Sequence, residues 1–326
     1  MRKSFILLTL VAFLPFAFPS VAEAIDAQGV NNADLSALPV EAPAQKPADP
    51  DAAIVKLQVL LDRAGSSPGV IDGYFGDNLT KAIAGFEALQ RLPVDGRVSP
   101  ELIGKLVDQV PPIQAYAITP EDGRDLVANI PDDYAKQAEM GHLGYVSIQE
   151  KLAERFHMHV DLLKALNPTA SFVPGETIAV AVPGAAKDGL VKRIEVRRKL
   201  GEVFAFAEND TLLAVYPATI GSKDTPSPSG THKVKGVSRM PKYTYNPKIN
   251  FQQGNNRKIL QLPGGPNGPV GTVWIDLTEP TYGIHGTPEP ELIGKVGSHG
   301  CVRLTNWDAE ELANMVKPGV TVQFRE

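Results

Sequence analysis

The spacing of apolar side chains changes several times along the chain, and each change predicts a new element. From Ala53 to residue 110, apolar positions recur at helical spacing in three stretches, separated by turns at Asp72–Gly73 and Asp95–Gly96. An Asp-Gly pair is typical of a turn because glycine accepts a positive φ and the aspartate caps the backbone. We therefore interpret both aspartates as turn residues rather than ligands. The pattern predicts a small three-helix domain over residues 51–110.

A second helical pattern lies in the middle of the chain. Apolar positions over residues 148–166 predict two short helices, which end at Asn167–Pro168. The alternation over residues 173–180, after a Pro-Gly turn, predicts a strand. We expect residues 144–183 to form a small module of their own.

The segments that flank these units lack a helical or strand period. Residues 25–50 mix Ala, Pro, Asn and Asp, and residues 111–143 are rich in proline and charge. Such composition is typical of connecting chain. We predict a flexible linker at 25–50 and a second linker at 111–143 that carries one short helix.

From Arg193 onward the pattern becomes that of strands. Ile194 and Val196 alternate with charged residues, and further strand-like runs follow, punctuated by Gly and Pro clusters. Residues 188–326 are long enough for an independent β-rich core, so the chain as a whole is expected to be a multi-domain α+β protein. Residues 238–267, rich in Tyr, Asn, Pro and Gly, are expected to form a mobile lid over a cleft.

The first 24 residues have the layout of a secretory signal peptide. Two basic residues precede an apolar run over residues 5–18, and Ala22 and Ala24 form a small-residue cleavage pattern. The run falls short of the ~20 residues that a bilayer needs, which favours cleavage after Ala24 over a membrane anchor. No later stretch is apolar enough to span a membrane, so we expect export to the periplasm without a remaining membrane span.

Composition narrows the classes of partner. The formal net charge is −5, and loss of the leader removes two positive charges and one negative charge, which leaves −6. This mild acidity argues against nucleic acid as the partner.

The chain holds one cysteine, so no internal disulfide forms, and an exported free thiol is open to oxidation. Cys301 is therefore either a small buried apolar residue or a reactive group.

The neighbours of Cys301 favour the reactive group. The string SHGCVRL at 298–304 is predicted as a strand, in which His299, Cys301 and Arg303 face one way while Val302 and Leu304 face the core. A structural cysteine is not expected to share its face with a histidine and an arginine, because both need polar partners there.

This arrangement suits nucleophilic catalysis on an amide. A thiol with a pKa of ~8.5 needs a base to become a thiolate at neutral pH, and His299 is placed to be that base. Arg303 either stabilises the thiolate or binds a substrate carboxylate, and the sequence does not decide between them. Gly300 has no Cβ, so a substrate can approach its backbone, where N–H groups can stabilise an oxyanion. His285, beside Gly286 in the string GIHGTPEP, is a loop histidine, which either lies at the surface or lines the same cleft.

Two other classes of function compete with this interpretation. His285, His299 and Cys301 are residue types that bind zinc, but no acidic general base accompanies them, so we expect no metal site. His157 and His159 are interpreted as surface or packing residues for a similar reason. The second alternative is a non-catalytic binding protein, in which the N-terminal modules matter and the last domain only holds a peptide.

Several strings resemble known families. IDGYFG at 71–76 and LPVDG at 92–96 resemble the peptidoglycan-binding-like domain, and the order of helices, NP and PGETIAV at 144–183 resembles a LysM-type glycan-binding module. TPSPSGTHKV at 225–234, HGTPEP and SHGCVRL resemble the YkuD-type L,D-transpeptidase catalytic domain, and this match spans nearly all of residues 188–326.

The last resemblance implies a β-sandwich-like fold and acyl transfer on peptidoglycan stem peptides. Cys301 matches the family nucleophile, His299 its general base, Gly300 the position whose carbonyl orients that base, and His285 a second histidine. The family thiolate attacks the third, diamino-acid residue of a tetrapeptide stem, expels the terminal D-Ala and forms a thioester. An amine of another stem then takes the acyl group. His285 and the remaining motif positions are expected to bind the substrate: Gly286, Ser298 and Arg303.

The acceptor stays open at this point. A second stem, the lysine of a wall-linked lipoprotein, a free D-amino acid or water would each resolve the same thioester. The implied partners are therefore peptidoglycan stem peptides and glycan, with a lipoprotein as a further candidate. No cofactor is expected, because the thioester carries forward the energy of the donor amide.

Overall fold

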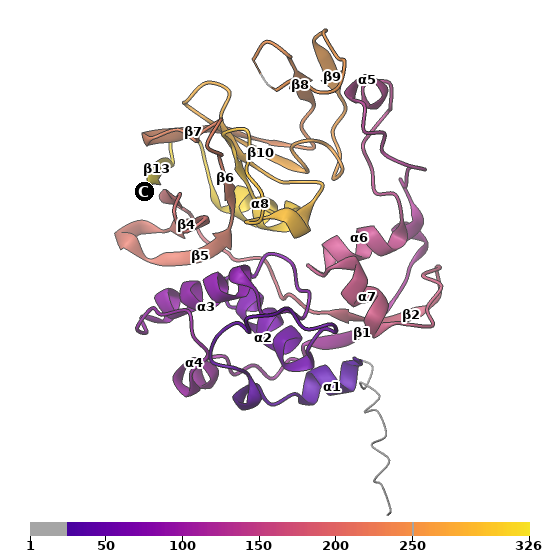
Figure 1. Ribbon diagram of the computed structural model, residues 1–326, viewed down its shortest axis with the longest axis vertical. Helices are drawn as coiled ribbons and strands as arrows, with labels where there is room; N and C mark the ends of the chain where they lie inside the picture. The colour runs from indigo at the N-terminus through magenta and orange to yellow at the C-terminus, as the bar shows by residue number, and fades with distance from the viewer. Residues whose placement is uncertain (1–24, 250) are drawn as a thin grey trace, which may run out of the picture.

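A computed structural model of the chain describes residues 25–249 and 251–326, and the predicted signal peptide lies outside the described residues. Figure 1 shows a helical N-terminal part below and a β-rich C-terminal part above, with a connecting segment that runs along both. No helix in the described residues is long and apolar enough to cross a bilayer.

The predicted three-helix domain is confirmed. Its helices are α2 (Ala52–Arg63), α3 (Asp77–Gln90) and α4 (Pro100–Lys105), and Ser99 caps α4 by accepting the backbone N–H of Leu102. The two turn aspartates also behave as predicted, because each accepts a backbone N–H two residues on, at 2.9 Å. The helices pack around a shared apolar core that includes the following fully or almost fully buried side chains: Leu57, Leu61, Leu79, Ile83, Phe86 and Leu102.

The prediction of a flexible linker at 25–50 is wrong in its first part. This segment contains helix α1 (Ala27–Asn32) and a 3₁₀ helix, η1 (Leu35–Ala37). Val30 is fully buried, and the Asn31 amide exchanges two hydrogen bonds with the backbone of Ile113, at 2.8 and 2.9 Å. Because these partners lie some 80 residues away, local composition carried no trace of them.

The middle module has the two predicted helices, α6 (Ile148–Arg155) and α7 (Val160–Leu166), and a strand, β2 (Thr177–Ala181). Strand β1 (Ile113–Ala117) pairs antiparallel with β2, so part of the predicted linker 111–143 belongs to this module. Sequence missed β1 because Ile113 is its only fully buried residue, which leaves little alternation to detect. The one short helix predicted in this linker is present as α5 (Tyr134–Gln137), which follows a 3₁₀ turn, η2 (Pro120–Gly123).

The C-terminal part is β-rich, as predicted. Its main sheet has the order β5-β4-β3-β13-β7-β10-β11-β12-β6, and β7 pairs with β13 through its first half and with β10 through its second. Apolar side chains of both halves and of helix α8 (Asn306–Met315) form one core, as in a sandwich. The strands are β3 (Arg193–Arg197), β4 (Glu202–Phe206), β5 (Leu212–Pro217), β6 (Thr219–Ile220), β7 (Gly230–Arg239), β10 (Val273–Leu277), β11 (Gly283–His285), β12 (Val302–Arg303) and β13 (Thr321–Arg325).

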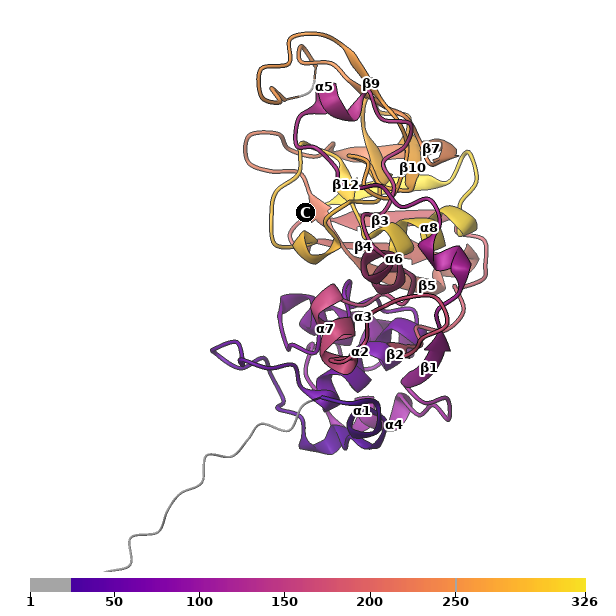
Figure 2. The same ribbon diagram turned by 90° about the vertical axis from the view of Figure 1, so that its right-hand side faces the viewer.

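Both N-terminal units dock onto this part. Residues 65–67, just after α2, hydrogen-bond to β5, where Ser67 N donates to Val215 O and Val215 N donates to Gly65 O, each at 2.9 Å. The middle module docks through Glu154, whose carboxylate accepts the side-chain amide of Asn306 at 2.9 and 3.2 Å. Figure 2 shows α6 close to α8 on this side of the molecule.

Candidate active site

A cavity of about 390 Å³ lies where β10, β11 and the start of β12 meet the hairpin of β8 (Tyr243–Tyr245) and β9 (Leu260–Leu262). Four of the predicted site residues line it: His285, His299, Cys301 and Arg303. The fold therefore brings together two histidine motifs that lie apart in the sequence.

Strand pairing explains why these side chains meet. In the parallel pairing of β11 with β12, His285 lies opposite Arg303, and in the antiparallel pairing with β10, Trp274 lies opposite His285. Side chains of paired residues project from the same face of a sheet. Val302 and Leu304 are fully buried on the other side, as predicted.

The string SHGCVRL is not a strand throughout, which corrects the prediction. Only Val302–Arg303 has strand geometry, and a bend precedes it. Gly300 has φ +102°, and a Cβ there would lie 2.7 Å from Cε1 of Tyr282. A side chain at this position would be strained both by its backbone conformation and by this ring. The bend therefore requires glycine, and it turns Cys301 toward the cavity.

Ser298 holds this bend. Its side chain is buried, and its Oγ donates to the carbonyl of Cys301 at 2.6 Å. The carbonyl of Ser298 accepts Thr225 Oγ1 at 3.1 Å. Ser298 therefore positions the bend and is not one of the residues that line the cavity, and its predicted contact with substrate stays a prediction.

His285 is the better oriented of the two histidines. It is 4% exposed, Trp274 stacks on it at 5.4 Å, and its Nδ1 lies 2.7 Å from the carbonyl oxygen of Gly286. Because a carbonyl only accepts, Nδ1 carries the proton and Nε2 keeps a free lone pair. Burial lowers the pKa of His285 to about 3, and the charge of Arg303 adds to this effect. The resting imidazole is therefore neutral, with the lone pair of Nε2 unprotonated.

Gly286 is fixed by a neighbouring asparagine. A Cβ on Gly286 would lie 2.2 Å from Oδ1 of Asn306, and the same oxygen accepts the backbone N–H groups of Thr272 and Thr287, both at 3.1 Å. Gly286 thus supplies its carbonyl to His285 from a position that Asn306 defines. Gly286 is not among the residues that line the cavity, and its predicted contact with substrate stays a prediction.

His299 has a different environment. Its side chain is exposed, and its ring stacks on Phe251 with centroids 4.2 Å apart. Partial burial and the charge of Arg303 lower its pKa. Among the described residues it makes no hydrogen bond, so the predicted orientation by the carbonyl of Gly300 is absent, and the histidine-carbonyl pair of this site is His285 with Gly286.

Cys301 is partly exposed, and its Sγ lies 3.8 Å from the carbonyl oxygen of Thr281. Burial raises the pKa of its thiol, while a backbone N–H from Gly283 and the charge of Arg303 oppose this effect only in part. The resting nucleophile is therefore a thiol, which needs a base when substrate is present.

Arg303 brings a positive charge to the cavity wall. Within the described chain its guanidinium has no ion pair or hydrogen bond, yet its charge influences the pKa values of both histidines and of the thiol. An uncompensated guanidinium beside a cavity is suited to an anionic ligand.

Sequence reasoning missed several aromatic residues of this cavity. Trp274 and Tyr282 come from β10 and the turn before β11, and Tyr134 comes from α5, far away in the sequence. The segment 238–267 that was predicted as a lid does contribute side chains to the wall: Tyr243, Ile249 and Phe251. Its mobility stays a prediction.

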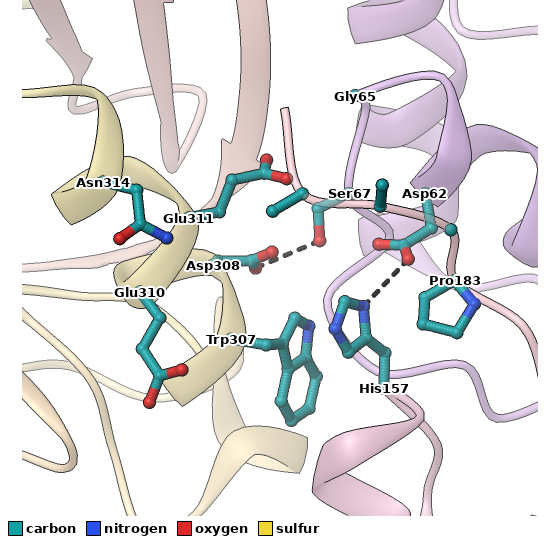
Figure 3. A pocket seen from close by; sticks show the side chains of 13 residues that line it. Asp62, Gly65, Ser67, His157, Pro183, Trp307, Asp308, Glu310, Glu311 and Asn314 are labelled. Atoms are coloured by element: carbon teal, nitrogen blue, oxygen red, sulfur yellow. Dashed lines mark hydrogen bonds and ion pairs between the residues drawn. The ribbon is translucent and has the colours of Figure 1, made fainter. Parts of the chain in front are cut away.

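A second cavity, of about 160 Å³, lies between α2, α8 and the middle module (Figure 3). Here His157 Nδ1 lies 2.8 Å from Oδ2 of Asp62, and Trp307 stacks on the His157 ring at 5.1 Å. Burial lowers the pKa of His157, but the Asp62 carboxylate outweighs it, so the pKa is raised. His157 is thus a packing residue, as predicted, and His159 caps α7.

The described residues contain no cluster of three or more His, Cys, Asp or Glu side chains with the geometry to hold a metal ion. His285, His299 and Cys301 do not form such a cluster, although they share one cavity. The three side chains line the cavity but do not converge on one position that a metal ion could occupy.

Among solved structures, L,D-transpeptidase 3 from Mycobacterium tuberculosis in complex with a faropenem-derived adduct is similar to this chain at 16% identity, with a TM-score of 0.35. The similarity covers 47% of this chain and 75% of that chain. An L,D-transpeptidase from Mycobacterium smegmatis is similar at 17% identity, with the same TM-score, over 48% of this chain and 65% of that chain.

Comparison of sequences gives a clearer result. The family model of the L,D-transpeptidase catalytic domain matches residues 191–323, and that of a putative peptidoglycan binding domain matches residues 50–106. The putative L,D-transpeptidase YkuD of Bacillus licheniformis is 32% identical over 147 residues, covering 45% of this chain and 73% of the relative. Its namesake in Bacillus subtilis is 29% identical over 174 residues, covering 52% and 89%. With these matches, the chain belongs to the YkuD family of L,D-transpeptidases.

Proposed function

We propose that this chain transfers peptidoglycan stem peptides through a thioester on Cys301. The donor is a tetrapeptide stem, and the bond broken joins its diamino acid to the terminal D-Ala. The observation that carries this proposal is the neutral His285, held by the Gly286 carbonyl, on the wall of the cavity that Cys301 and Arg303 also line.

His285 is the general base of this proposal, in place of the His299 predicted from sequence. Its Nε2 is the free acceptor of an imidazole whose other nitrogen is already engaged. His299 lacks such a partner among the described residues and stacks on Phe251 instead. His299 is then a binding surface for the substrate at the mouth of the cavity.

The acylation step follows from these assignments. His285 Nε2 takes the proton of the Cys301 thiol as the sulfur attacks the carbonyl carbon of the diamino acid. The tetrahedral intermediate collapses, the imidazolium gives its proton to the leaving amine of D-Ala, and a thioester remains on Sγ. Arg303 favours this step because its charge stabilises the thiolate.

The acceptor is an amine of a second stem, which yields a 3-3 crosslink and restores the thiol. The matched peptidoglycan-binding domain supports the wall polymer as the partner and an address outside the cytoplasm. The middle module is proposed as a further glycan contact, as its LysM-like sequence suggests. A lipoprotein lysine, a D-amino acid and water are the other acceptors that product analysis distinguishes.

Intact-protein mass spectrometry tests the acyl-enzyme. The wild type and Cys301→Ala are incubated with a purified tetrapeptide stem and, separately, with a carbapenem as a thiol-acylating probe. We expect an adduct in the wild type alone. Adding a second stem should then release a crosslinked dimer. An adduct in neither protein, together with unchanged binding to isolated peptidoglycan, would favour the non-catalytic wall-binding alternative.

A further inference from the structure

One wall of the catalytic cavity comes from outside the catalytic domain. Tyr134 lines the cavity, yet it lies in α5, between the segments matched by the two family models. Figures 1 and 2 both show α5 beside the β8–β9 hairpin, at the far end of the molecule from the N-terminal helices. The segment between the two matched domains therefore extends along the catalytic domain and places Tyr134 at the cavity.

Hydrogen bonds fix the backbone around Tyr134. Its N–H donates to Oε1 of Gln253 at 3.2 Å, and Nε2 of Gln253 donates to the carbonyl of Asp132 at 2.6 Å. Nδ2 of Asn256 donates to Oδ1 of Asp133 at 2.8 Å. These bonds join α5 to the chain between β8 and β9, so Tyr134 has one defined position over the cavity.

Aromatic contacts hold the ring itself. Tyr134 makes edge-to-face contacts with Tyr245, Tyr243 and Phe251, with centroids 5.4, 6.2 and 6.1 Å apart. Phe251 in turn stacks on His299. Although its side chain is partly buried, the Tyr134 hydroxyl has no hydrogen-bond partner among the described residues. It is available to a ligand in the cavity.

Arg303 provides the complementary charge. It lines the same cavity and likewise has no ion pair within the described chain. Burial raises the pKa of Tyr134 to about 12 while the charge of Arg303 opposes that shift, so the phenol stays protonated. A phenol O–H and a guanidinium are both donors, and together they suit a carboxylate.

We propose that Tyr134 and Arg303 together bind the terminal carboxylate of the donor stem. This rests on the proposed function, in which that carboxylate belongs to the leaving D-Ala, one residue beyond the carbonyl that Cys301 attacks. Only a stem of the right length places its terminal carboxylate at Tyr134, so a residue outside the catalytic domain then contributes to selectivity for stem length. Stems whose carboxylate is amidated, or displaced by an extra residue, lose this contact.

Binding in the Cys301→Ala background tests the proposal without turnover. Calorimetry compares a tetrapeptide stem that has a free terminal carboxylate with the same stem as its C-terminal amide. We expect the free acid to bind more tightly than the amide. Tyr134→Phe should reduce this ratio of affinities by about tenfold, which corresponds to the loss of one hydrogen bond to a charged group. Tyr74→Phe is the matched control, because its hydroxyl donates to the carbonyl of Ala48 in the N-terminal part and does not line the cavity.

Two results overturn the proposal. One is a Tyr134→Phe variant that keeps the full preference for the acid. The other is a preference that disappears only in Tyr243→Phe, which would assign the contact to the neighbouring phenol. Neither result touches the proposed function, which fails only if the wild type forms no acyl adduct. Normal carbapenem adduct formation by Tyr134→Phe with Cys301 intact shows that this variant folds.

Discussion

The Nδ1 atom of His285 lies 2.7 Å from the carbonyl oxygen of Gly286, the residue that follows it. This contact fixes the tautomer of the imidazole, because the carbonyl accepts only from a protonated nitrogen. Asn306 holds Gly286, and its amide donates to the buried carboxyl group of Glu154 in the middle module. The orientation of the base thus depends on contacts that extend beyond the catalytic domain.

Replacement of the two histidines should separate their roles. We expect His285→Asn to slow acylation by a tetrapeptide stem by about 10²- to 10⁴-fold, the usual contribution of a general base. His299→Asn should slow it less than about tenfold, since its loss removes only a stacking surface. Single-turnover mass spectrometry measures both rates. A larger loss in His299→Asn would return the role of base to His299.

Arg303→Gln should raise the pKa of the Cys301 thiol. Burial already raises this pKa, and the charge of Arg303 opposes the effect by favouring the thiolate. Without that charge, the increase of the iodoacetamide alkylation rate with pH should occur at a higher pH than in the wild type. Arg325→Gln, an exposed arginine of β13, is the control. An unchanged alkylation profile in Arg303→Gln would show that the guanidinium does not act on the sulfur.

Glu154 makes the free energy of unfolding depend on pH. Burial raises its pKa from 4.5 to about 8, and hydrogen bonds from Asn306 and Tyr145 only partly offset this. The folded state therefore keeps a proton that the unfolded chain releases, so this contribution is fully present below pH ~4.5 and is lost as pH rises through 8.

Glu154→Gln should remove this dependence. The free energy of unfolding of the variant, relative to the wild type, is expected to increase between pH ~4.5 and ~8, by at most about 1.4 kcal/mol per pH unit. Urea denaturation at several pH values measures it. Glu139→Gln, at an exposed position, should run parallel to the wild type. A constant difference between Glu154→Gln and wild type would mean that Glu154 is ionised in the folded protein.

Gly300→Ala should disturb the bend that presents the thiol. The new Cβ would meet the ring of Tyr282 at 2.7 Å, and φ +102° is unfavourable for alanine. We expect a loss of about 1–3 kcal/mol in the free energy of unfolding and slower acylation. The double variant with Tyr282→Ala removes the steric contact but not the backbone strain, so it should recover only part of the loss. Full activity in Gly300→Ala would show that the bend tolerates a side chain.

Local patterns predicted much of the fold. The three helices of the N-terminal domain, the two helices of the middle module and the strands after Arg193 all carry periodic apolar positions and clear end signals such as Ser99. The helix at 27–32 and strand β1 escaped because each buries one main residue against partners far along the chain. Such contacts leave no period in the local sequence.

The site was predicted in its members but not in their roles. Both histidines precede a glycine, so the sequence offers two equivalent His-Gly pairs, and proximity to the cysteine along the chain favours His299 as the base. Only the parallel pairing of β11 with β12 shows that His285 lies across from the end of the cysteine motif. Tyr134 carried no signal at all, because its segment resembles a linker in composition.

The main sheet ends in two edge strands, β5 and β6, and the backbone edge of β5 is partly covered. Residues 65–67 of the N-terminal helical part bond to Val215, and α3 lies so close that a Cβ on Gly85 would sit 3.1 Å from that residue. An exposed strand edge can pair with a strand of another molecule. The N-terminal helical part covers this edge of β5 and therefore opposes self-association. A chain shortened to residues 188–326 lacks this cover, and we expect it to form oligomers that light scattering detects. A thiol that still reacts with a carbapenem would show that the shortened chain is folded.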